Sequence, residues 1–129
     1  MPKRVLLCDD DVHILRAAEF KLKRAGYEVR TAGDGQEGWE LIQEQVPDVV
    51  VTDCQMPRLD GFGLLGRIRE NPETESLPVM MLTAKGFEID EQAAANEYDV
   101  REVIAKPFSP RELLQKVDAL LAGEPAAVE

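Results

Sequence analysis

Short hydrophobic runs alternate with longer amphipathic segments along the whole chain. Four of the runs are typical of buried strands and occupy residues 4–8, 49–52, 79–82 and 103–105. Continuous apolar runs of this length favour parallel strands that are covered on both faces. A fifth segment, residues 27–32, alternates polar and apolar side chains and predicts a short strand at the edge of the sheet.

The segments between the strands have the spacing of helices with one buried face. In the first of them this spacing connects Ile14, Ala18, Leu22 and Ala25. Asp11 lies just before this segment and can cap the helix. Further helices are predicted over about residues 36–45, 62–70, 89–97 and 110–121.

Five strand–helix units predict one α/β domain, a doubly wound parallel sheet with helices on both faces. Right-handed crossovers leave few arrangements, and the natural one for five strands is the flavodoxin-like order 2-1-3-4-5. The domain is expected to comprise residues 1–122, and residues 123–129 are expected to form a flexible tail.

Polar residues follow four of the strands directly. Asp9 and Asp10 follow the first run, Asp53 follows the second, and Thr83 and Lys106 follow the last two. In the predicted order these strand ends meet at the crevice where open α/β sheets bind ligands. Adjacent carboxylates repel one another unless a cation or a proton intervenes. The set can therefore bind a divalent cation and accept a phosphoryl group.

Composition and charge further limit the range of functions that the chain can have. A formal net charge of −10 argues against direct binding of nucleic acid, whose phosphates would be repelled. No apolar run approaches the ~20 residues that span a bilayer, so no membrane segment is expected. Two cysteines and one histidine, without metal-type spacing, argue against a zinc site or a disulfide scaffold. A cytoplasmic location is the simplest expectation.

Four motifs together resemble the receiver domain of two-component response regulators, including the chemotaxis regulators. They occur in the family's order and at family-like separations, from Lys3 to about Leu121. The motifs are Asp9-Asp10, Asp53-Cys54-Gln55-Met56-Pro57-Arg58-Leu59-Asp60-Gly61, Leu82-Thr83-Ala84-Lys85 and Lys106-Pro107-Phe108.

The resemblance implies a phosphoacceptor that takes a phosphoryl group onto Asp53. Such a domain is a signalling module that catalyses its own phosphorylation and dephosphorylation, not an enzyme with a separate substrate. Asp10, Asp53 and the backbone carbonyl of Gln55 would hold Mg²⁺, with Asp9 placed to bind it through water. Oxygen ligands and retained waters suit this ion.

The resemblance also assigns the remaining polar groups and the partners. Lys106 and Thr83 would contact phosphoryl oxygens as part of the catalytic set. The phosphoryl donor would be a sensor histidine kinase or a histidine phosphotransfer protein, which would dock on Leu15, Pro107 and Phe108. The downstream protein is not specified, and a homodimer could form on phosphorylation.

Two positions depart from the family pattern. Val103 occupies the position, three residues before the lysine, where the family usually has Tyr or Phe. Asp99 replaces a usual glycine, and Asp tolerates a left-handed turn only moderately well. Without the aromatic ring, the phosphorylation signal is expected to pass through residues 84–88 and the fourth helix.

The sequence leaves open three alternative functions from other classes of protein. A Mg²⁺-dependent phosphatase of the haloacid dehalogenase type shares a strand-end Asp nucleophile, but it needs a second carboxylate where this chain has Gln55. A flavodoxin-type electron carrier needs a phosphate-binding loop where Asp9, Asp10 and Asp11 would repel the phosphate. A receiver that only binds partners would lack part of the polar set. Asp11 itself could be no more than a helix cap.

Overall fold

The computed structural model describes residues 2–84 and 98–122, and its strands form one parallel sheet. The strand order is β2-β1-β3-β4-β5, as predicted. β3 and β4 are buried along their whole length, which explains their continuous apolar sequence. The strands are β1 (Arg4–Cys8), β2 (Glu28–Ala32), β3 (Val49–Asp53), β4 (Val79–Thr83) and β5 (Val100–Ala105).

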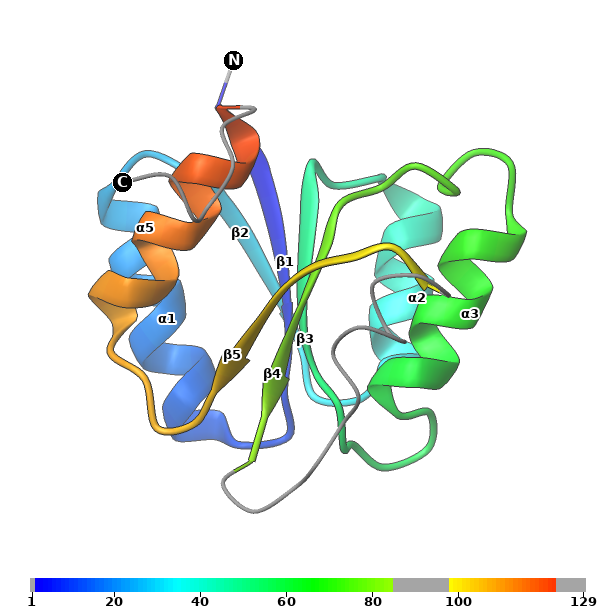
Figure 1. The fold of residues 1–129 in the computed structure, drawn as a ribbon, viewed down its shortest axis with the longest axis horizontal. Coiled ribbons are helices and arrows are strands. Elements are labelled where there is room, and N and C mark those ends of the chain that lie inside the picture. The colour runs from blue at the N-terminus through cyan, green and yellow to red at the C-terminus, as the bar shows by residue number, and fades with distance from the viewer. Residues whose placement is uncertain (1, 85–97, 123–129) are drawn as a thin grey trace.

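Helices cover both faces of the sheet, with α1 and α5 on one face and α2 and α3 on the other (Figure 1). Their bounds are α1 (Val12–Arg24), α2 (Gly35–Glu44), α3 (Gly61–Glu70) and α5 (Pro110–Leu121). The helix predicted over residues 89–97 and the predicted tail lie outside the described residues, as does most of the expected signal route. No helix in the described ranges is long and apolar enough to span a bilayer.

Each described helix begins at a side chain that accepts a hydrogen bond from the first turn. Asp34 caps α2, Asp60 caps α3 and Ser109 caps α5. Asp11 caps α1 and accepts from the backbone N–H groups of His13 and Ile14. These caps satisfy donors that a helix leaves without partners.

Two hydrophobic clusters pack against the two faces of the sheet. One cluster joins β1, β3 and β4 to α2 and α3, and includes Ile42, Leu64 and Ile68. The other joins the opposite face to α1 and α5 through Leu22, Leu113 and other apolar residues. Ala25, which we assigned to the buried stripe of the first helix, is instead the exposed C-cap of α1, because that helix ends one residue before it.

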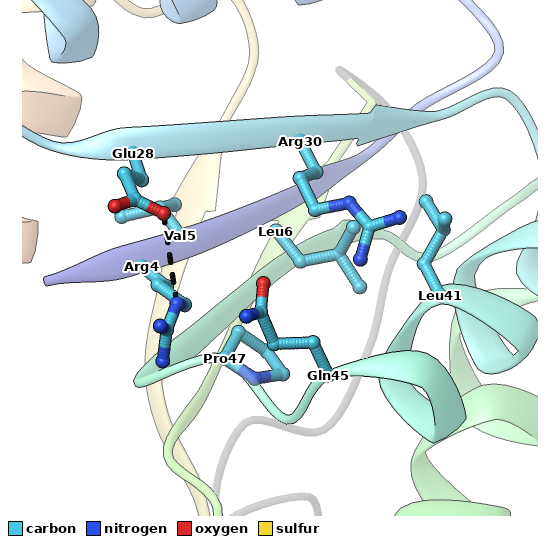
Figure 2. A pocket seen from close by; sticks show the side chains of 8 residues that line it. All are labelled: Arg4, Val5, Leu6, Glu28, Arg30, Leu41, Gln45 and Pro47. Carbon is cyan, nitrogen blue, oxygen red and sulfur yellow. Dashed lines mark ion pairs between the residues drawn. The ribbon is translucent and has the colours of Figure 1, made fainter.

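A small pocket lies between β1, β2 and the end of α2, and Leu41, Gln45 and Pro47 line it together with residues of the two strands (Figure 2). Its accessible volume is only about 20 Å³, which is room for about one water. Arg4 at its rim lies 3.6 Å from Glu28, measured from Nε to Oε1. Arg30 pairs with Glu44 of α2 at 2.8 Å, measured from Nη2 to Oε1. Both arginines that line this pocket are therefore paired with a carboxylate.

Candidate functional site

Three carboxylates converge at the opposite, carboxyl end of the sheet. Asp53 is the last residue of β3, and Asp9 follows β1, which pairs with β3 through Cys8 and Thr52. Asp9, Asp10 and Asp53 offer carboxylate oxygens that all lie within 4.8 Å of one another. Asp9 and Asp53 are 1% and 5% exposed, whereas Asp10 is exposed.

Lys106 supplies the positive charge next to these carboxylates. Its Nζ lies 2.8 Å from Oδ2 of Asp9 and 3.3 Å from Oδ2 of Asp53. Lys106 follows β5, and its backbone N–H donates to the carbonyl oxygen of Thr83 at 2.7 Å. This bond joins the residue after β5 to the buried Thr83 at the end of β4.

The electrostatics of the site show how these groups influence one another. Burial raises the pKa of Asp53, and the nearby charge of Asp9 raises it further against the opposing effect of Lys106. The backbone of Gln55 also acts against the rise in the pKa of Asp53. Burial alone would lower the pKa of Lys106, but Asp9 and Asp53 raise it above its usual value. The lysine therefore stays charged at neutral pH.

The donor set fits a hard divalent cation such as Mg²⁺. Among the described residues, one ammonium group lies beside the three carboxylates and offsets one of them, so these residues leave two negative charges at the cluster when all three carboxylates are ionised. Oδ1 of Asp9 accepts a hydrogen bond from the backbone of Asp11 at 2.9 Å. Its buried Oδ2 accepts none from the described residues and has only the ion pair with Lys106. All-oxygen donors with a surplus of negative charge are what Mg²⁺ prefers.

Gln55 lies in the tight loop that connects β3 to α3. The backbone N–H of Gly61 donates to the carbonyl oxygen of Cys54 at 3.0 Å and closes the loop. A Cβ atom at Gly61 would collide with the carbonyl oxygen of Asp53, so the close approach requires glycine there. The loop can therefore return to α3 directly beside Asp53.

An apolar pocket of about 370 Å³ opens beside Lys106. Of the three residues that we expect to form a docking surface, Pro107 and Phe108 line this pocket and Leu15 does not. Leu15 instead packs against the hydrophobic cluster beneath α1, the alternative that its helical spacing left open. The lining residues of α1 are His13, Ile14, Ala17 and Ala18. Sequence reasoning missed Ala17, although it lies three residues after Ile14 on the same helix face.

The two departures from the family pattern have simple structural settings. Asp99 has a φ of +57°, so it adopts the left-handed conformation that glycine usually supplies. Val103 in β5 is half-buried and packs against the cluster on the α2 and α3 face.

The chain belongs to the response regulator receiver domain family, which it matches over residues 5–118. It is therefore a receiver domain of two-component response regulators, and the matches give no support to the haloacid dehalogenase alternative.

Individual relatives agree with this assignment. Over 121 residues the chain is 36% identical to the alkaline phosphatase synthesis transcriptional regulatory protein PhoP of Bacillus subtilis, covering 94% of this chain and 49% of PhoP. The chain thus spans about half the length of the curated relatives it matches.

Solved structures are similar over nearly their whole length. The chemotaxis protein CheY4 of Vibrio cholerae superposes with a TM-score of 0.83 at 29% identity, over 92% of this chain and 98% of that one. A response regulator receiver domain protein from Clostridium thermocellum gives 0.81 at 30% identity, over 94% and 95%.

Proposed function

We propose that Asp53 accepts a phosphoryl group from a phosphohistidine of a sensor kinase or phosphotransfer protein. The observation that carries this proposal is the position of Asp53, which shares the ammonium group of Lys106 with the buried Asp9. A carboxylate oxygen of Asp53 attacks phosphorus, the new O–P bond forms, and the N–P bond of the donor breaks with its electron pair leaving on the imidazole nitrogen.

The acidic cluster would hold Mg²⁺ during this step. Asp10, Asp53 and the backbone carbonyl of Gln55 would be direct ligands, and Asp9 would bind through water. Bound Mg²⁺ supplies positive charge that offsets the charge on the carboxylates and the incoming phosphoryl oxygens. The exposed position of Asp10 leaves its carboxylate free to turn toward the ion.

Lys106 and Thr83 would bind the phosphoryl group once it is on Asp53. The lysine is already charged, so its ammonium can move from the Asp9 and Asp53 oxygens to a phosphoryl oxygen without any proton transfer. The Thr83 hydroxyl would donate to a second oxygen. Ala84, which follows Thr83, is small and leaves room for the group to enter. Attack of water on the same phosphorus would break the O–P bond to Asp53, release inorganic phosphate and restore the carboxylate.

The apolar pocket beside Lys106 would receive the phosphoryl donor. It lies between α1 and the segment that follows β5, and Lys106 lines both it and the acidic site. A partner seated there would bring its phosphohistidine to Asp53. The net charge of −10 makes proteins, not nucleic acids, the expected partners of this domain. A phosphorylation-dependent homodimer and an unspecified downstream protein remain part of the proposal.

The test uses Mg²⁺ and a small phosphodonor such as acetyl phosphate, followed by intact mass. We expect one phosphate adduct that requires Mg²⁺ and is absent from Asp53→Asn. An adduct on another residue would contradict the assignment of Asp53. Rapid turnover of many phosphodonor molecules without an adduct would favour a phosphatase instead.

A further inference from the structure

The loop between β3 and α3 is tied to the beginning of α2 by an ion pair that joins distant parts of the chain. Nε of Arg58 donates to Oδ2 of Asp34 at 3.0 Å, and Nη2 donates to Oδ1 at 3.1 Å. Both carboxylate oxygens are therefore engaged by one guanidinium group. Paired contacts of this kind fix direction as well as distance.

A backbone contact joins the same two segments. The N–H of Gly35 donates to the carbonyl oxygen of Leu59 at 2.9 Å. A Cβ atom at position 35 would collide with that oxygen, so the approach is possible only with glycine. The tip of the loop therefore rests directly on the first residue of α2.

Arg58 adopts a backbone conformation that costs free energy. Its φ is +67°, in the left-handed region that residues other than Gly, Asn and Asp seldom occupy. Its side chain is 59% exposed, so burial does not hold it in place. The loop tip is held by the ion pair with Asp34 and by the hydrogen bond from Gly35 to Leu59, and contacts of this kind can offset the cost of such a conformation.

Asp34, the partner of Arg58 in this ion pair, is itself held in place and so anchors the loop. It caps α2, with Oδ1 accepting from the backbone N–H of Glu37 at 2.8 Å, and its side chain is only 16% exposed. Oε1 of Glu37 in turn accepts from the N–H of Gly33 at 2.9 Å, which fixes the turn before the helix. The pKa of Asp34 is held below its usual value by the Glu37 N–H and by Arg58, so the anchor is charged.

The loop segment between Cys54 and Arg58 contains Gln55, whose backbone carbonyl is the proposed metal ligand. At one end the N–H of Cys54 donates to the carbonyl oxygen of Leu82 at 3.0 Å and holds the loop to the sheet. At the tip Arg58 holds it to α2. Gln55 lies between the two points, so its backbone carbonyl has little freedom once both are fixed.

We propose that Arg58 is a positioning residue for Mg²⁺ binding. Its ion pair with Asp34 holds the loop in the conformation that presents the Gln55 carbonyl, and so sets the affinity for Mg²⁺ without touching the ion. The inference rests on the proposed function of the acidic site. Outer groups that orient metal ligands typically change metal affinity by about 10–100-fold when they are removed.

The test compares Arg58→Gln with Arg30→Gln in the whole chain. Arg30 also pairs with a carboxylate of α2, Glu44, at 2.8 Å, but at the other end of that helix. Calorimetric titration with Mg²⁺ should show a dissociation constant about tenfold higher for Arg58→Gln and an unchanged one for Arg30→Gln. Phosphorylation by acetyl phosphate should slow at low Mg²⁺ and recover at saturating Mg²⁺, which a general folding defect would not produce.

Asp34→Asn provides a second variant, because Asn also caps helices well but lacks the charge that Arg58 binds. It should weaken Mg²⁺ binding similarly, and combining it with Arg58→Gln should add little. Wild-type affinity in Arg58→Gln, or fully additive losses in the double variant, would overturn the inference. Failure of the wild-type chain to bind Mg²⁺ at all would instead contradict the proposed function of the acidic site.

Discussion

The two ends of the sheet carry charged residues in contrasting ways. At the amino end, Arg4 pairs with Glu28 beside a pocket that has room for about one water (Figure 2). Arg30, which also lines this pocket, pairs with Glu44. At the carboxyl end, three carboxylates cluster beside one ammonium group of the described residues, that of Lys106. The two that pair with it, Asp9 and Asp53, are buried.

The contrast lies in charge balance, not in the number of charges. Paired surface charges need no further ligand and contribute little to stability. Buried like charges raise the free energy of the folded state until a cation or a proton relieves them. The surplus at the carboxyl end is therefore expected to appear as metal binding, as reactivity and as pH dependence, none of which should appear at the amino end.

The largest expected effect follows from Asp53→Asn. This change should abolish phosphorylation by acetyl phosphate, because an amide is a poor nucleophile and a weak Mg²⁺ ligand. The fold should remain, and the unliganded protein should melt no lower than wild type, since one member of a like-charge cluster is removed. Intact mass and thermal melting measure both outcomes. Glu28→Gln at the amino end is the control and should be phosphorylated normally.

The second prediction concerns stabilisation by Mg²⁺. Saturating Mg²⁺ should raise the melting temperature. At a Mg²⁺ concentration a hundred times the dissociation constant, the free energy of unfolding should rise by about 2.7 kcal/mol. Asp10→Ala should reduce this rise more than Asp9→Ala, because Asp10 is the proposed direct ligand. Each variant is compared with itself, with and without Mg²⁺, since loss of the buried Asp9 also removes the ion pair with Lys106. An equal rise in wild type and Asp10→Ala would exclude Asp10 as a ligand.

A smaller effect is expected at the apolar pocket. Ala17 is exposed and lines the pocket, so Ala17→Lys should obstruct the donor protein. Phosphotransfer from the cognate kinase should slow by about tenfold, equivalent to about 1.4 kcal/mol, while the rate with acetyl phosphate stays unchanged. Gln43→Lys, exposed on α2, should alter neither rate. Leu15→Lys should instead lower the stability of the fold and slow phosphorylation from both donors, because Leu15 packs on the core.

The smallest effect is a dependence of stability on pH. Folding raises the pKa of Asp53, so as pH rises above the ordinary value of about 3.9 the unfolded chain loses this proton before the native state does. The native state then binds more protons, and this group's contribution makes stability fall as pH rises through the folded pKa. Without Mg²⁺, the difference in melting temperature between Asp53→Asn and wild type should therefore grow above about pH 4. A difference that stays constant with pH would contradict the raised pKa.

The sequence by itself determined the sheet, its order and the edge where the polar residues meet. Continuous apolar runs specify buried parallel strands, and the handedness of their connections leaves few orders. The residue after each run then lies at the carboxyl edge whatever the details of packing. For this reason Asp9, Asp53 and Lys106 could be placed together without coordinates. Asp11 was also recognisable as a cap, because capping is local in sequence.

Only the tertiary structure decided which of these side chains are buried and which partner each one contacts. It buried Asp9 against Lys106 and left the adjacent Asp10 exposed, a difference that two neighbouring aspartates do not reveal in sequence. It also turned Leu15 toward the core and Ala17 toward the pocket, although helical spacing allowed a wider buried stripe.

The ion pair between Arg58 and Asp34 had no signal in the sequence at all. The two residues are 24 positions apart, and their contact depends on a loop with a positive φ at Arg58. Hydrophobic periodicity and capping act between near neighbours along one element, so they fix where each element lies. The meeting of two loop side chains depends on the exact path of the backbone between elements, which only the folded packing of β3, α2 and α3 defines.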